Sequence, residues 1–173
     1  YLAPDTNHPG VDMLAATSAP PPVMCKVTVA IHDLRDAECQ PSLDDNGFAY
    51  LDAATATRDF FDHHAVSKFY FAECAALVAS ATGARHVHAF DYNLRDKSLA
   101  RQANSGVSEP VRFVHNDYTE RSGPQRVRDL LPPDEAEARL RKRFAQYNVW
   151  RNIAHDPVEM SPLGFVDSGS IAP

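Results

Sequence analysis

Hydrophobic and polar positions along the chain follow two different periods, and the clearest pattern is helical. Between residues 60 and 82, apolar side chains recur every three or four positions, as they do along the buried face of a helix. They include Val66, Cys74, Leu77, Val78 and Ala81. Gly83 follows directly, and glycine commonly ends a helix because it adopts the left-handed conformation without strain. We therefore predict a helix over residues 60–82.

Shorter apolar segments predict strands, with partial alternation of apolar and polar side chains in residues 23–31. The other strand candidates are residues 48–51, 86–90, 111–114 and 146–150. Asn46-Gly47 predicts a tight turn, and the polar stretch 97–109 predicts an exposed loop. Near residues 125–131 we expect a short helical turn. A second helix is expected over 134–144, where acidic residues come first and basic residues last. A long early helix with separated short strands indicates an α+β architecture.

The first 22 residues differ from the rest because they are rich in proline, including the run Pro20–Pro22. Proline removes a backbone donor and fixes the chain in extended conformations. We predict an extended N-terminal arm over residues 1–22 and a single domain over 23–173. The total of 173 residues is enough for one domain with a hydrophobic core.

Composition and charge exclude several classes of function. The chain is 44% hydrophobic and carries a net charge of −6, which disfavours nucleic acid as a partner. No stretch approaches the roughly 18 apolar residues needed to cross a bilayer, so no membrane span is expected. The three cysteines are far apart and form no metal-binding pair or disulfide framework. We therefore expect a cytoplasmic protein that acts on a small molecule.

The triplet His115-Asn116-Asp117 is the strongest chemical signal. At the end of the strand predicted over 111–114, residues i and i+2 point to the same face, so an imidazole and a carboxylate could reach one metal ion. Two histidines and one carboxylate leave three positions open on Fe(II), which the metal needs for a co-substrate and O2. His-x-Asp alone occurs by chance in many proteins, so the triplet by itself is also compatible with residues that bind no metal.

The segments around the triplet are more specific. Residues 111–119 and 122–132, followed by Tyr147–Ile153 and then Pro157-Val158 and Pro162-Leu163, resemble the AsaB-type hydroxylase/desaturase family. This family includes cephem methoxylase-like and gibberellin desaturase-like proteins. Residues 90–95 are similar to a further segment of the family. The resemblance covers roughly residues 27–173.

The resemblance implies a jelly-roll (double-stranded β-helix) core with an N-terminal helix. It also implies an oxygenase that uses Fe(II) and 2-oxoglutarate to hydroxylate or desaturate a small molecule, as enzymes of secondary metabolism do. His115 and Asp117 would be the metal ligands. The cofactor supplies the oxidative chemistry, and the protein supplies orientation and exclusion of water.

A complete site of this kind needs a second histidine, and the one that follows Asp117 in this sequence is His155. It lies in the polar stretch Ala154-His155-Asp156-Pro157, where a solvated loop is expected rather than a ligand. We therefore expect a domain whose jelly roll is incomplete at the C-terminal end, from a truncated chain. The alternative is a non-catalytic remnant or binding module of the same scaffold. A third hypothesis is a metal-dependent enzyme that needs no oxoacid, such as a cupin-like isomerase.

Other candidate residues are less specific. Tyr118 and Thr119 follow the ligand pair and could line a substrate pocket or simply pack. Arg151 could pair with an anionic co-substrate or form a structural salt bridge. His86 and His88 share a predicted strand face but lack an obvious third ligand, and His63-His64 is expected at the surface. The sequence determines neither the substrate nor the oligomeric state.

Overall fold

The computed structural model describes residues 28–36, 40–99, 106–111 and 114–170. The chain divides into two compact units, residues 1–40 and 41–173. In the first unit, the described residues contain the 3-10 helix η1 (Leu34–Asp36). The predicted arm over 1–22 and the start of the predicted strand 23–31 lie outside the described residues, and residues 28–31 have no regular structure.

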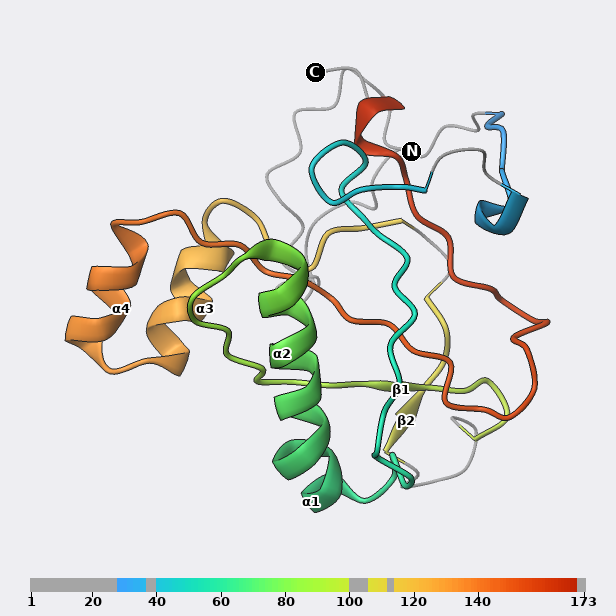
Figure 1. The fold of residues 1–173 in the computed structure, drawn as a ribbon, viewed down its shortest axis with the longest axis horizontal. Coiled ribbons are helices and arrows are strands. Elements are labelled where there is room, and N and C mark those ends of the chain that lie inside the picture. Colours follow the sequence, from blue (N-terminus) through green and yellow to red (C-terminus); the bar gives the residue numbers. More distant parts are fainter. Residues whose placement is uncertain (1–27, 37–39, 100–105, 112–113, 171–173) are drawn as a thin grey trace, which may run out of the picture. The chain divides into compact units, whose positions relative to one another are not determined.

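The main helix of the second unit is a continuous run of three pieces (Figure 1). They are α1 (His63–Ala65), the π-helical η2 (Val66–Tyr70) and α2 (Phe71–Thr82). The helix begins at His63 rather than at residue 60 because the Asp62 carboxylate accepts hydrogen bonds from the amides of His64 and Ala65, at 2.9 and 3.2 Å. It ends at Gly83, whose φ of 69° is left-handed and whose N–H donates to the Ala79 carbonyl. The predicted helix and its end are confirmed.

Two short helices, α3 (Ser122–Leu130) and α4 (Pro133–Leu140), form a hairpin. Leu131 is extended because the following residue, Pro132, disfavours helical geometry before it, and Pro133 then opens α4. Arg128 donates to Glu137 at 2.7 Å across the hairpin, and this contact lowers the pKa of the Glu137 carboxyl. Both predicted helices are present. The second ends four residues earlier than predicted, because the chain tightens into a turn in which the Lys142 amide donates to the Arg139 carbonyl.

The described residues contain one small sheet, in which β1 (Leu94–Arg95) runs parallel to β2 (Val107–Ser108). Leu94 aligns with Val107 and Arg95 with Ser108. The expectation of a loop throughout 97–109 is therefore wrong at its end. The segments predicted as strands at 48–51, 86–90 and 146–150 have no regular structure, and neither have the described residues 111 and 114. A strand needs a neighbour to pair its backbone groups, and these segments have none among the described residues. The jelly roll remains a prediction.

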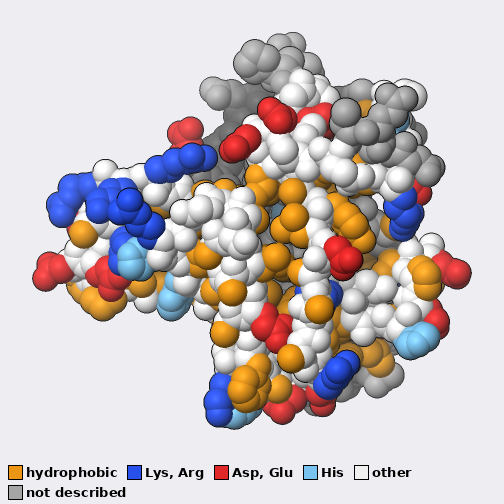
Figure 2. All heavy atoms as spheres, in the orientation of Figure 1, with side chains coloured by type: hydrophobic (Ala, Val, Ile, Leu, Met, Phe, Trp, Pro, Cys, Tyr) orange, Lys and Arg blue, Asp and Glu red, His pale blue; other side chains and the backbone are white. Residues whose placement is uncertain are grey.

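Hydrophobic burial is sparse in the part of the chain that the structure describes. Its fully buried hydrophobic side chains are Val66 and Ala136. Large apolar side chains are exposed instead, and Figure 2 shows many of them on one face. The region after α4 is typical, with Trp150 at 53% and Phe165 at 49% exposure. None of the described helices is long and apolar enough to cross a membrane.

Long-range polar contacts supplement this limited core. The Glu73 carboxylate of α2 accepts hydrogen bonds from the Thr55 hydroxyl and from the Ala56 amide. The predicted turn at Asn46-Gly47 is also present, with a φ of 81° at Gly47. Its Asn46 carbonyl accepts from the Ser168 amide at 3.0 Å, beside a stack of Phe48 on Phe165. The two ends of the second unit are therefore joined by backbone and aromatic contacts.

Replacing Gly83 with alanine should destabilise the protein although nothing lies within 4 Å of the added Cβ. The left-handed conformation destabilises a residue that has a Cβ by about 1–2 kcal/mol, and this penalty is smaller for asparagine. Urea unfolding followed by circular dichroism should rank Gly83→Ala below Gly83→Asn, and both below the unmodified protein. Gly164→Ala is the matched control because its Cβ also meets open space and its φ is not left-handed. Equal loss in Gly83→Ala and Gly164→Ala would contradict the assigned cap.

Candidate metal-binding cleft

A cleft of about 500 Å³ lies where the chain enters α3. Two segments form it: the residues around the His115 triplet with the start of α3, and the residues that follow α4. From the second segment the cleft is lined by alternate residues, Phe144, Gln146 and Asn148. Alternation is the geometry of an extended chain, in which every second side chain faces the same way. The segment predicted as a strand over 146–150 therefore presents one face to the cleft without being paired in a sheet.

His115 and Asp117 approach each other in this cleft. The Nε2 atom of His115 lies 3.4 Å from Oδ1 of Asp117, and the two side chains are 42% and 44% exposed. The Asn148 side-chain amide donates to the other carboxylate oxygen, Oδ2. Asn148 thereby fixes the orientation of the carboxylate and leaves Oδ1 facing the imidazole. His115 and Asp117 therefore lie close together, but residues 114–117 form no strand, and Asn116 between them also lines the cleft.

Gly123 allows the two walls of the cleft to come this close. It is buried in the first turn of α3, and a Cβ built there would lie 3.3 Å from Oε1 of Gln146. The same Cβ would lie 3.9 Å from the Phe144 ring and from Cβ of Tyr118. A methyl group at this position would require the end of the Gln146 side chain to shift by a few tenths of an ångström.

Tyr118 and Thr119 both line the cleft, as one of the two predictions for them states. Thr119 also organises the start of α3. Its hydroxyl oxygen accepts from the amides of Arg121 and Ser122, at 3.3 and 3.1 Å, and its carbonyl accepts from the Gly123 amide. These bonds satisfy amides that a helix leaves unpaired at its start. Tyr118 is half-buried.

Arg151 does not line this cleft. Its guanidinium donates to the Tyr70 hydroxyl at 3.1 Å and to the Ala53 carbonyl at 2.8 Å, and it lies over the Tyr70 ring. These contacts favour a structural role for Arg151 over binding of an anionic co-substrate. The partners are a phenol and a carbonyl rather than the carboxylate expected for a salt bridge. Burial raises the pKa of Tyr70, against the opposing effect of the Arg151 hydrogen bond, and burial also raises the pKa of the Cys74 thiol nearby.

The remaining histidines do not complete a metal site among the described residues. His155 is fully exposed and lies 3.3 Å from the carboxylate of its neighbour Asp156. His63 contacts Tyr92. Within the described ranges, no group of three or more His, Cys, Asp and Glu side chains is placed to hold a metal ion. Glu120 also lines the cleft, but the two candidate ligands that the structure brings together are His115 and Asp117.

Comparison with known proteins assigns the chain to a family. The model of the family described as "YDMC: Oxidoreductase/YMDC permease-like domain" matches residues 6–173. A relative in Methylophilus leisingeri, described as an uncharacterized protein in the dcmA 3' region, is 31% identical over 154 residues, which are 72% of this chain and 70% of that protein. The chain belongs to this oxidoreductase family.

Several fungal relatives have names that state a function. The hydroxylase/desaturase CTB9 of Cercospora beticola is 31% identical over 155 residues, covering 83% of this chain and 47% of that protein. The Fe(II)/2-oxoglutarate-dependent dioxygenase nvfI of Aspergillus novofumigatus is 33% identical over 151 residues, covering 84% and 52%. The chain thus spans about half the length of these fungal relatives. No solved structure matches it.

Asn148 is the site residue of this oxidoreductase domain that sequence reasoning did not single out. It lies 31 positions beyond Asp117, and no local pattern connects the two. The available signal was its place in Tyr147–Ile153, one of the segments that carry the family resemblance. The sequence marked the segment, but only the folded chain brings its amide to the Asp117 carboxylate.

Removing the Arg151 contacts should lower stability. Arg151→Ala leaves the Ala53 carbonyl and the Tyr70 hydroxyl without this donor, and the expected loss in free energy of unfolding is about 1–3 kcal/mol. A double-mutant cycle with Tyr70→Phe should give a coupling of at least about 0.5 kcal/mol. Arg128→Ala is the control, because its ion pair with Glu137 is exposed and should contribute at most about 1 kcal/mol. Additive effects of the Arg151 and Tyr70 changes would show that the two side chains act independently.

Proposed function

We propose that this chain carries the His-x-Asp part of the iron site in an Fe(II)/2-oxoglutarate-dependent oxygenase. The enzyme hydroxylates or desaturates a small molecule, as the AsaB-type resemblance implies. The observation that carries the proposal is the approach of His115 Nε2 to Asp117 Oδ1 at 3.4 Å in an open cleft. The names of the fungal relatives support the choice of metal and co-substrate.

The two side chains fit a shared metal ion. Ligand atoms that are each about 2.1 Å from one metal lie roughly 3.0 Å apart when they occupy adjacent octahedral positions. The distance of 3.4 Å between Nε2 and Oδ1 is close to that value, so small rotations would bring both atoms onto one ion. An imidazole nitrogen and a carboxylate oxygen are also the donor types that iron accepts in such sites.

The other residues of the cleft have supporting tasks in this proposal. Asn148 holds Oδ2 of Asp117, so that Oδ1 is the oxygen available to the metal. Thr119 and Gly123 set the start of α3 against the ligand segment, and Tyr118 forms part of the wall that faces a substrate. Fe(II) with 2-oxoglutarate supplies the oxidising power when bound, and the chain supplies ligands, orientation and a shaped cavity.

The proposal requires a third metal ligand, and none of the described residues is placed beside His115 and Asp117 to supply it. It also requires a cation or hydrogen-bond donor for the oxoacid carboxylate. Arg151 does not supply one in this structure, because its guanidinium bonds Tyr70 and Ala53. A scaffold that keeps the cleft without catalysis is the alternative, and turnover separates the two. Succinate formation that depends on iron and 2-oxoglutarate supports the oxygenase, whereas iron binding without succinate, whatever the substrate offered, supports the binding module.

Replacing either ligand should abolish metal binding. We expect His115→Ala and Asp117→Ala to lose the visible absorption of Co(II), used as a spectroscopic substitute for iron, and to form no succinate. The matched control is His155→Ala, which also removes a histidine beside an aspartate but at a fully exposed position. Circular dichroism should show that all three variants are folded. Unchanged metal affinity in His115→Ala would falsify the assignment.

Asn148 should act as a positioning residue through Asp117. We expect Asn148→Ala to weaken metal binding by about 10- to 100-fold, because the freed carboxylate can rotate away from His115. Isothermal titration with Mn(II) measures this change directly. Asn152→Ala is a useful control, since Asn152 bonds the backbone of its own loop rather than the cleft. Identical affinities of Asn148→Ala and the unmodified protein would remove Asn148 from the site.

A further inference from the structure

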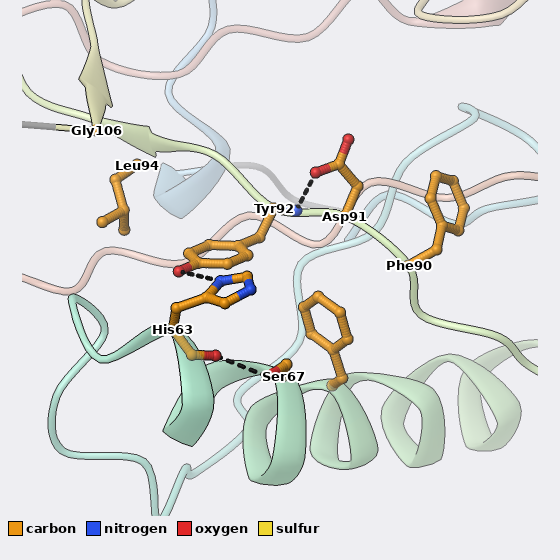
Figure 3. A pocket seen from close by; sticks show the side chains of 8 residues that line it. His63, Ser67, Phe90, Asp91, Tyr92, Leu94 and Gly106 are labelled. Carbon is orange, nitrogen blue, oxygen red and sulfur yellow. Dashed lines mark hydrogen bonds between the residues drawn. The ribbon is translucent and has the colours of Figure 1, made fainter.

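A second pocket, of about 450 Å³, lies away from the His115 cleft and shares no lining residue with it. It is formed between the start of the main helix and the segment that leads into β1 (Figure 3). Its volume falls within the range of about 300–1,000 Å³ typical of small-molecule sites. None of the features described so far accounts for this pocket.

The wall of the pocket is largely aromatic. The ring of Phe71 meets the edge of Tyr92 at 6.0 Å between centroids and an interplanar angle of 80°. The His63 ring stacks on the Tyr92 ring, with 5.6 Å between their centroids and an interplanar angle of 18° (Figure 3). Phe90 and Leu94 add further half-buried apolar surface. Such a set of rings favours a flat, apolar ligand that can stack or meet ring edges.

His63 supplies the polar anchor. Its Nδ1 lies 3.2 Å from the Tyr92 hydroxyl, and Nε2 has no hydrogen-bond partner among the described residues. In a neutral imidazole one nitrogen donates and the other accepts, so the role of Nε2 depends on which way the proton between Nδ1 and Tyr92 points. A ligand hydroxyl both donates and accepts, and it therefore matches Nε2 in either case.

The charges around the pocket disfavour an anionic ligand. Among the residues that the structure describes, no lysine or arginine lines it, and the Asp91 carboxylate lies at its edge, turned away from the stacked rings (Figure 3). Arg126 is the nearby cation, but its guanidinium is already placed over the Phe90 ring at 4.9 Å and lies 3.9 Å from Asp91. Asp91 therefore offsets part of this positive charge, and the buried Nε atom of Arg126 has no hydrogen-bond partner among the described residues.

Arg126 also connects this pocket with the metal cleft. It belongs to α3, whose first turn contains Gly123 of the cleft, and it holds the Phe90-Asp91 wall of the pocket. One helix thus supports both cavities. We propose that the pocket binds a neutral aromatic ring bearing a hydroxyl group and, resting on the proposed oxygenase function, that this ring belongs to the substrate.

Binding of three matched probes tests the proposal on the protein without iron or oxoacid. We expect 2-naphthol to bind, naphthalene to bind more weakly, and naphthalene-2-sulfonate to bind most weakly, as measured by fluorescence titration. Phe71→Leu should weaken 2-naphthol binding by about five- to tenfold. Phe69→Leu is its control, because Phe69 lies on the same helix with its side chain 54% exposed and outside the pocket. His63→Ala should weaken 2-naphthol binding more than it weakens naphthalene binding, because it removes both a ring of the wall and the polar anchor.

A variant that fills the pocket tests the proposal without removing any side chain of the aromatic wall. Ser67 lines the pocket from the exposed side of the helix, so Ser67→Trp should block 2-naphthol binding while every aromatic contact of the wall is kept. Tighter binding of the sulfonate than of 2-naphthol would overturn the proposal, and so would equal binding in Ser67→Trp and the unmodified protein. His115→Ala should still bind 2-naphthol. Loss of the iron site and loss of this pocket are thus distinguishable.

Discussion

The contacts of Arg151 are the interactions on which the described arrangement of the second unit most depends. The guanidinium bonds the Tyr70 hydroxyl of the main helix and the Ala53 carbonyl, which are 81 and 98 positions away in the sequence. The described residues bury few hydrophobic side chains completely. Hydrogen bonds between distant segments therefore contribute more than usual to holding those segments together. The Ala53 segment is held a second time by Glu73 of α2, through Thr55 and Ala56. A planar guanidinium with several donors suits this task because it can serve two acceptors and stack at once.

The same short segment that ends in Arg151 also builds the candidate metal site. Phe144, Gln146 and Asn148 face the cleft in alternation, and Arg151 turns to the main helix three positions later. Asn148 and Arg151 therefore connect the orientation of the Asp117 carboxylate with the packing of the helix.

Helix α3 also contacts both cavities. Its first turn carries Gly123, which admits Gln146 at close range, and its second turn carries Arg126, which reaches Phe90 and Asp91. One short element thus supports a cavity with candidate metal ligands and an aromatic cavity whose described lining contains no lysine or arginine. An enzyme that oxidises a neutral organic molecule needs both kinds of surface, one for the reacting centre and one for recognition.

The sequence by itself determined the local features, because each depends on neighbours within a few positions. The helix ending at Gly83 and the turn at Asn46-Gly47 follow from periodicity and backbone preference. The order of the segments also indicated an oxidoreductase, and at that level the family is confirmed. Strand pairing was not, because an apolar segment such as 86–90 becomes a strand only if a partner lies beside it. Only the tertiary structure could show that Asn148 holds Asp117 and that Arg151 is committed to Tyr70 and Ala53, because those contacts join residues separated by 31 to 98 positions.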